Sequence, residues 1–175
     1  SLELMETAGR SVFDIIKGEF GGLKRAVVLC GRGSNGGDGW IVSRLLHEHG
    51  IEVEGVSFIR ADDLRGDSRA AFDRATASGL LVTEIVNEDE WKRWLQEQVS
   101  SKTQKESLLK NRANTDVVVD ALVGTGLNRP LTGLFASVVR DINNSEGFDN
   151  FTVVAIDIPS GFASDSICEP CLLYS

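Results

Sequence analysis

Five short apolar runs, separated by segments of helical periodicity, limit the folds that this chain can adopt. Runs that are apolar throughout are typical of strands covered on both faces of a parallel sheet. The helical stripes between them, such as residues 134–142, indicate crossover connections. We therefore predict an α/β fold with a mostly parallel sheet. The apolar runs occupy residues 26–30, 51–58, 80–86, 116–120 and 151–158.

A glycine-rich stretch, GRGSNGGDG, follows the first apolar run at residues 31–39 and precedes a helix predicted to begin at Trp40. It contains the spelling G-x-G-x-x-G, which suggests an NAD-dependent dehydrogenase, but a lone match is weak evidence. A dinucleotide site needs an acid at the end of the second strand, and Asp62 and Asp63 come late for it. Asp38 would cap the helix or repel a pyrophosphate. No Gly-Lys-Ser/Thr follows, so a P-loop is excluded.

Polar side chains follow three of the predicted strands, at an edge where parallel sheets bind ligands. Asn35 lies in the first loop, Asp120 ends the fourth strand, and Asp157 and Ser160 end the fifth. These hard oxygen ligands suit an alkali or alkaline-earth cation. Asp157 stands between glycine loops, where burial would favour acid–base chemistry. The alternatives are that the loops are ordinary tight turns and that Asp157 is a cap.

The remaining segments carry less information about function. Asn87 and Glu90 resemble a capping pair for a helix that carries Trp91 and Trp94, and residues 100–115 are predicted to form a surface loop. Cys168 and Cys171 form a C-x-x-C without a partner pair, so we do not assign it a metal or redox function. The length of 175 residues favours a single domain over residues 1–175.

Composition excludes some partners. The net charge of -8 and the pI near 4.8 disfavour nucleic acid or an anionic membrane as the main partner. No apolar run reaches the roughly 20 residues of a membrane helix. Three cysteines are too few for a disulfide framework, so we expect an intracellular location, in the cytoplasm or the mitochondrion. Because the chain begins at Ser1 rather than Met, a targeting segment upstream stays open.

Four motifs taken together resemble the NAD(P)H-hydrate epimerase family. They are LMETAGR at residues 4–10, GRGSNGGDG at 31–39, DALVGTGLNRPLTG at 120–133 and AIDIPSG at 155–161. The resemblance implies a Rossmann-like three-layer sandwich and a homodimer. It also implies an isomerase that interconverts the R and S forms of hydrated NADH and NADPH in nicotinamide nucleotide repair. A separate dehydratase then removes water from the S form and so restores the cofactor.

The resemblance also implies site residues. Asp157 would be the catalytic acid in contact with the ligand, and one potassium ion per subunit would lie at Asn35, Asp120 and Ser160. Substrate contacts would come from Ser34, Asn35, Gly36, Gly37, Asp38, Gly124, Thr125, Gly126, Leu127, Asn128, Arg129, Pro130 and Asp157.

The chain departs from the family pattern in two places. Ser34 stands where the family commonly has an asparagine, and residues 162–175 do not continue the family pattern. We therefore expect the C-terminal part of the family domain to be truncated or replaced. This departure keeps an alternative function open: a non-catalytic, Rossmann-like ligand-binding or interaction module. Retention of Asn35, Asp38, Asp120 and Asp157 favours the enzyme.

Overall fold

A computed structural model describes residues 1–106, 116–127, 130–144 and 151–161, with only the helical path over 99–106. Five strands form one sheet in the order β3-β2-β1-β4-β5, and every neighbouring pair is parallel. The predicted parallel α/β fold is confirmed. The elements are α1 (Leu2–Glu19), β1 (Arg25–Cys30), α2 (Ser34–Glu48), β2 (Glu52–Ser57), the 3-10 helix η1 (Ala61–Asp63), α3 (Gly66–Ala77), β3 (Leu81–Glu84), α4 (Glu88–Glu106), β4 (Asp116–Ala121), α5 (Gly133–Asn143) and β5 (Phe151–Ala155).

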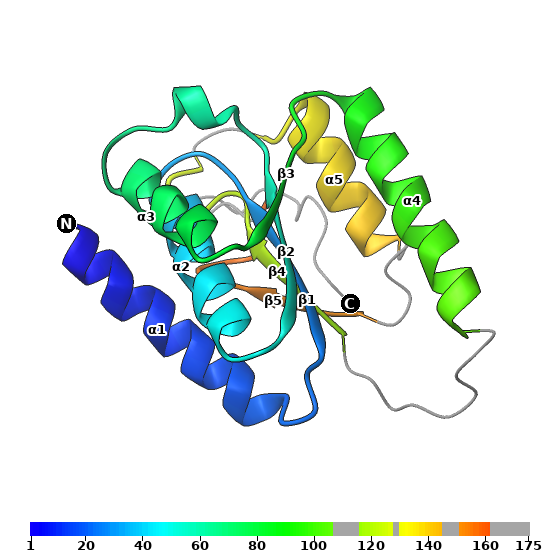
Figure 1. Ribbon diagram of the computed structural model, residues 1–175. Helices are drawn as coiled ribbons and strands as arrows, with labels where there is room; N and C mark the ends of the chain where they lie inside the picture. Colours follow the sequence, from blue (N-terminus) through cyan, green and yellow to red (C-terminus); the bar gives the residue numbers. More distant parts are fainter. Residues whose placement is uncertain (107–115, 128–129, 145–150, 162–175) are drawn as a thin grey trace.

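Helices cover both faces of the sheet, which makes the predicted three-layer sandwich (Figure 1). One core packs α1, α2 and α3 against side chains such as Val28 and Val119. The other packs α4 and α5 against the alternate side chains of the same strands, such as Val27 and Val118. Successive strand residues point to opposite faces, so strands buried on both sides must be apolar throughout. This requirement explains the continuous apolar runs in the sequence.

The start of α2 differs from the prediction, which placed Ser34 to Gly39 in a loop. The helix begins at Ser34 and includes the glycines at 36, 37 and 39. Glycine lowers helix propensity by roughly 1 kcal/mol relative to alanine, so propensity alone argued against this. Close packing decides otherwise: a Cβ on Gly36 would lie 1.9 Å from the Gly31 carbonyl oxygen, and one on Gly39 2.6 Å from the Ala121 Cβ. The glycines bring α2 against the sheet.

The region predicted as a surface loop also differs, because α4 continues to Glu106. Residues 100–106 were predicted to be part of a loop because they include no apolar residue. Polar residues such as Gln104, Lys105 and Glu106 are nevertheless good helix formers. Residues 107–115 lie outside the described part of the chain, as do Cys168, Cys171 and the rest of 162–175.

The N-terminus of α4 confirms the predicted capping pair. The Glu90 backbone N–H donates to Asn87 Oδ1 at 2.9 Å, and the Val86 N–H donates to the Glu90 carboxylate at 2.8 Å. Two backbone donors at the helix start are thereby satisfied.

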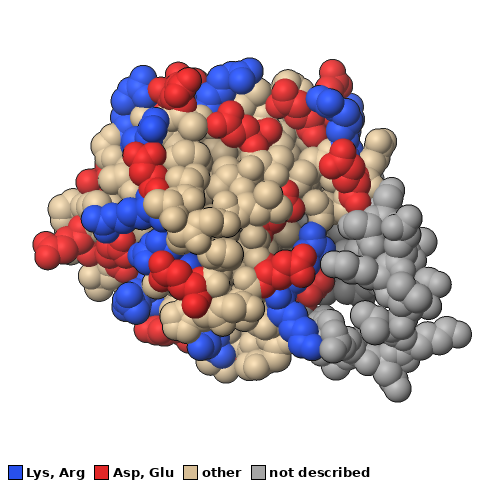
Figure 2. Space-filling model, in the orientation of Figure 1, with Lys and Arg blue, Asp and Glu red and all other residues tan. Residues whose placement is uncertain are grey.

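Acidic and basic side chains are interspersed on the face shown in Figure 2, without a large region of one sign. Within the described residues, no helix has the length and apolar character that a bilayer-spanning segment requires.

Candidate functional site

The strand order reverses direction between β1 and β4, which places a switch point at their carboxyl ends. There the β1–α2 and β2–α3 connections lead to one face of the sheet, and the β4–α5 connection leads to the other face. Open parallel sheets bind ligands in the crevice that such a reversal leaves. The loops singled out in the sequence after the first, fourth and fifth strands all leave from this edge.

Asp120 and Ser160 tie two of these strand ends together. Asp120 is fully buried at the end of β4, opposite Leu29 of β1 and Ala155 of β5. Its carboxylate accepts hydrogen bonds from the Ser160 hydroxyl and backbone N–H, both at 2.7 Å. The Ser160 oxygen in turn accepts the Val123 N–H at 3.0 Å. The pair fixes the loop after β4 against the loop after β5.

Asn35 and Asp157 flank Gly124 in the loop after β4. A Cβ built on Gly124 would lie 2.7 Å from Asp157 Oδ2 and 3.5 Å from the side chain of Asn35. Asp157 also accepts the Thr125 N–H at 2.8 Å. Both polar atoms of the Asn35 amide are buried without a hydrogen-bond partner in the described part of the chain. Buried amides are almost always paired, so Asn35 is a candidate to bind a ligand or an ion.

Asp38 is the half-buried carboxyl group of the site. Burial raises its pKa to about 6, and the nearby negative charge of Asp157 adds to the rise. Asp157 itself is exposed, so the expectation that it is buried was wrong. Asp38 is the fifth residue of α2, which also rules out the suggestion that it caps the helix. A carboxyl group with such a pKa exchanges a proton near neutral pH.

The spacing of α2 explains how these side chains reach one site. Asn35 and Asp38 are three residues apart and therefore share a helix face. The intervening glycines face other layers: Gly36 packs on the Gly31 backbone, and Gly37 would clash with Met5 of α1 if it had a Cβ. The sequence NGGDG thus combines two polar side chains with the close packing of a helix start.

The other residues predicted to contact substrate fall into two groups. Buried Gly36 and Gly37 serve close packing here, and their contact with substrate stays a prediction. Exposed or half-buried residues around the edge are Ser34, Gly124, Thr125, Gly126, Leu127 and Pro130, whereas Asn128 and Arg129 lie outside the described residues.

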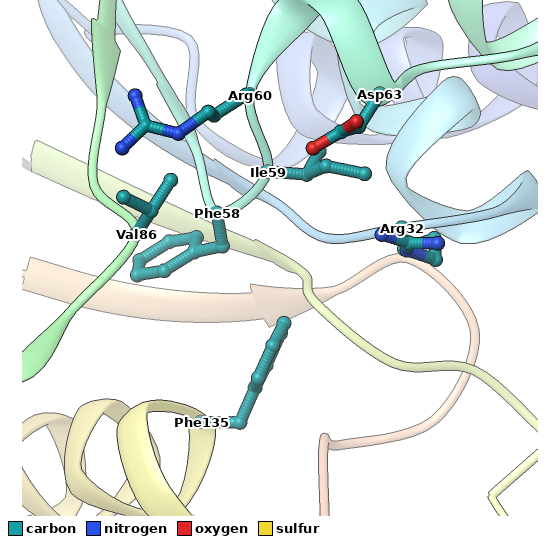
Figure 3. A pocket seen from close by; sticks show the side chains of 7 residues that line it. All are labelled: Arg32, Phe58, Ile59, Arg60, Asp63, Val86 and Phe135. Atoms are coloured by element: carbon teal, nitrogen blue, oxygen red, sulfur yellow. The ribbon is translucent and has the colours of Figure 1, made fainter.

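A pocket of about 270 Å³, which the sequence analysis did not identify, opens beside this group (Figure 3). Aromatic and aliphatic side chains form its centre, with guanidinium groups on two sides. An arginine at the end of the second strand was the signal that could have found it. The lining residues are Arg32, Phe58, Ile59, Arg60, Asp63, Val86 and Phe135.

A cation site of the kind predicted needs oxygen donors. Asn35, Asp120 and Ser160 supply an amide, a carboxylate and a hydroxyl, which suit a hard cation. The unpaired buried amide of Asn35 is the observation that fits such an ion or a ligand. Across the described ranges, no three His, Cys, Asp or Glu side chains gather into a metal-binding group.

Comparison with known proteins decides the family. The model of a family described as YjeF-related protein N-terminus matches residues 1–170. The chain belongs to this family. Over 96% of its length, this YjeF-related domain is 36% identical to a protein of Roseobacter litoralis named NAD(P)H-hydrate epimerase, and it covers 72% of that protein.

Longer relatives carry more than this domain. A Thermofilum pendens protein named bifunctional NAD(P)H-hydrate repair enzyme Nnr is 37% identical over 93% of this chain, which spans only 28% of that protein. The crystal structure of yeast ynu0 superposes with a TM-score of 0.74 at 23% identity and covers 98% of this YjeF-related domain and 68% of the yeast chain. The yeast structure supports the fold.

Proposed function

We propose that this chain interconverts the R and S epimers of hydrated NADH and NADPH. The names of its relatives support the reaction class. The observation that carries the proposal is the meeting of Asp157 and the buried, unpaired amide of Asn35 around Gly124, with Asp38 near enough for the charge of Asp157 to raise its pKa.

The chemistry requires a group that gives and takes one proton. The hydrated carbon bears a hydroxyl group and is bonded to the ring nitrogen. A carboxylic acid protonates the hydroxyl, the C–O bond breaks and water leaves while the nitrogen lone pair forms an iminium. Water then adds to the opposite face, and the carboxylate takes back the proton. Asp157 is the proposed acid in contact with substrate, and Asp38 beside it, with a pKa of about 6, exchanges a proton near neutral pH.

Asn35 positions the ring in this proposal. Its buried amide can both donate to and accept from the substrate carboxamide or hydroxyl group. Asn35, Asp120 and Ser160 are also the residues proposed to hold potassium, which would supply fixed positive charge beside the two carboxyl groups.

The decisive experiment mixes the protein with the R epimer of hydrated NADH in potassium buffer and follows the epimer ratio by chromatography. The wild-type protein should equilibrate the epimers faster than a protein-free blank. Asp157→Asn should lower the catalysed rate by about 100-fold or more, because proton transfer is lost. Asp14→Asn, which removes an exposed carboxylate on α1, should keep the wild-type rate.

Two further arms limit the interpretation. A wild-type rate equal to the blank would overturn the enzyme and favour the alternative, a non-catalytic ligand-binding module. Tetramethylammonium in place of potassium should lower both the rate and the melting temperature. An unchanged rate and an unchanged melting temperature would contradict potassium binding.

The proposed partners follow from the same reaction. A hydrated cofactor that exists as two epimers needs an epimerase only where the next enzyme accepts one of them. We therefore propose functional coupling to a dehydratase of hydrated NAD(P)H, which fits relatives named as bifunctional repair enzymes. The homodimer stays a prediction.

A further inference from the structure

The pocket beside the acid group lies on the same sheet edge at a distance suited to the second half of a dinucleotide. Arg32 lies two residues before α2 and three before Asn35, whereas Arg60 lies three residues beyond β2. Neighbouring strands lie about 4.8 Å apart, so the ends of β2 and β5 are separated by about 14 Å. An extended dinucleotide reaches from one to the other.

The centre of the pocket suits a flat, apolar ring. Phe58 and Phe135 have ring centroids 5.9 Å apart and tilted by 44°. Phe58 is 6% exposed and its ring centroid lies 5.9 Å from that of Trp91, so neighbouring side chains fix its position. A volume of about 270 Å³ lies just below the range of sites that enclose whole drug-sized ligands, which favours one heterocyclic base.

The rim of the pocket suits anions. Arg32 and Arg60 are exposed and lie on opposite sides of the apolar centre (Figure 3). Neither guanidinium forms an ion pair with another described residue. The carboxylate of Asp63 also lines the pocket, and Glu90 is near enough to interact with Arg60. Among the side chains that line the pocket, two are cations and one is an anion, in a chain of net charge -8.

The position of Arg60 indicates what the anion is. Residues at the end of the second strand and just beyond it face the adenosine ribose in dinucleotide sites of this topology, and Arg60 lies three residues beyond the end of β2. An acid there binds the free 2′-hydroxyl of NAD, whereas an arginine accommodates the 2′-phosphate of NADP. Arg32, closer to α2, lies beside the helix N-terminus, where a pyrophosphate binds in such sites.

We propose that this pocket takes the adenosine 2′-phosphate end of the substrate and makes the protein selective for the NADPH hydrate over the NADH hydrate. Phe58 and Phe135 contact the adenine, Arg60 binds the 2′-phosphate and Arg32 binds the phosphate on the 5′ side. The proposal rests on the proposed function for the nature of the substrate, but the pocket itself can be tested without turnover.

Calorimetric titration with two fragments provides that test. Adenosine 2′,5′-bisphosphate should bind the wild-type protein about tenfold or more tightly than adenosine 5′-monophosphate, because an arginine–phosphate contact is strong. Arg60→Gln should bind both equally while keeping its affinity for the monophosphate, which also shows that it is folded. Arg32→Gln should weaken both alike. Arg10→Gln, an exposed control on α1, should change neither.

Kinetics provide the second readout. The wild-type protein should have a KM for the NADPH hydrate about tenfold or more below that for the NADH hydrate, and Arg60→Gln should bring the two values together. Equal binding of the two fragments by the wild-type protein, or discrimination retained in Arg60→Gln, would overturn the pocket proposal. If the protein is an active epimerase but does not discriminate between the two hydrates or the two fragments, only the pocket proposal fails. If the protein discriminates between the two fragments but has no epimerase activity, only the proposed function fails.

Discussion

Burial of the Asp38 carboxyl group destabilises the folded protein, but only when the group is ionised. Its pKa of about 6 arises mainly from burial, with the charge of Asp157 as the second cause. In the unfolded chain the value is near 3.8. Between these two pH values the folded state holds a proton that the unfolded state has lost. Stability therefore falls as pH rises from about 4 to about 6 and stays low above that.

Asp38→Asn should consequently stabilise the protein above pH 6 and leave it unchanged near pH 4. The full shift corresponds to about 3 kcal/mol, and solvent screening of the half-buried group lowers our expectation to about 1–2 kcal/mol. Urea unfolding at both pH values measures it. Asp14→Asn, on the exposed face of α1, serves as the control. An equal gain at both pH values would contradict the burial explanation.

The sequence showed that acids gather at the carboxyl edge, but not which of them is buried. Asp157 lies between glycine loops, yet it is Asp38 that the packing of α2 half-buries. Burial of a side chain depends on layers that meet from distant parts of the chain. Arg60 was not among the predicted residues, because the dinucleotide pattern requires an acid near the end of the second strand.

At the scale of elements, α2 shows how one glycine motif serves several contacts. Gly33 has a φ of 90°, which L residues rarely adopt, and it stands just before the helix. A Cβ on Gly31 would lie 1.9 Å from the Leu122 carbonyl oxygen. The motif therefore allows β1, the start of α2 and the end of β4 to meet, whatever ligand binds there.

Two alanine substitutions separate packing from function. Gly36→Ala should lower the unfolding free energy by about 3 kcal/mol or more, because its Cβ meets the Gly31 backbone. Gly124→Ala should cost less than about 1 kcal/mol, since the exposed Asp157 side chain can turn away, but the proposed activity should fall. Urea unfolding and the epimer assay measure both.

The control for this pair is Gly18→Ala in α1, where nothing lies within 4 Å of the new Cβ. It should leave stability unchanged or slightly higher, because alanine favours a helix. A loss below about 1 kcal/mol for Gly36→Ala would contradict the packing argument, because the close approach to the Gly31 backbone would then be relieved at little cost.

Elements with a strong apolar pattern could be predicted, and those shaped by tertiary contacts could not. β1 and β4 could be predicted from their continuous apolar runs, because both faces of these strands are buried. The start of α2 escaped prediction because its glycines contact residues such as Ala121, far away in the sequence. The end of α4 escaped because polar helix formers carry no apolar stripe.

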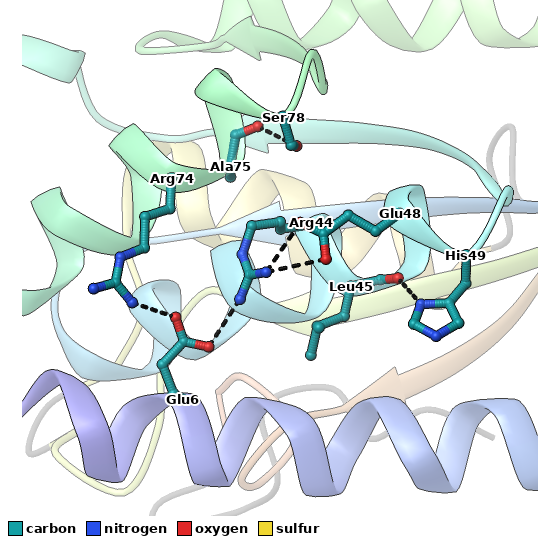
Figure 4. A network of polar contacts seen from close by, with 8 residues as sticks. All are labelled: Glu6, Arg44, Leu45, Glu48, His49, Arg74, Ala75 and Ser78. Carbon is teal, nitrogen blue, oxygen red and sulfur yellow. Dashed lines mark hydrogen bonds and ion pairs between the residues drawn. The ribbon is translucent and has the colours of Figure 1, made fainter.

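At the scale of the whole molecule, three helices of one layer are joined through Glu6. Its carboxylate pairs with Arg44 of α2 at 2.8 Å and with Arg74 of α3 at 2.7 Å (Figure 4). The Glu6 side chain is 24% exposed, so solvent screens these pairs incompletely. No local pattern in the sequence indicates such a link, because its three members are far apart along the chain.

Glu6→Gln should lower the unfolding free energy by about 1 kcal/mol, and the loss should shrink in 1 M salt. The comparison is Glu48→Gln, which removes only a pair with Arg44 inside α2 and should cost about 0.3–0.5 kcal/mol. Denaturant unfolding at two salt concentrations tests this. Equal costs for the two variants would show that the link between helices adds nothing.

The Asp120–Ser160 pair has a consequence for the order in which the sheet is assembled. Two hydrogen bonds to the fully buried Asp120 carboxylate, near the carboxyl end of β4, come from a residue beyond the last described strand. Until that segment docks, the end of β4 must keep its charge in water. The edge that carries the candidate site is therefore completed by its last segment in the chain, so a partly folded chain lacks a finished site.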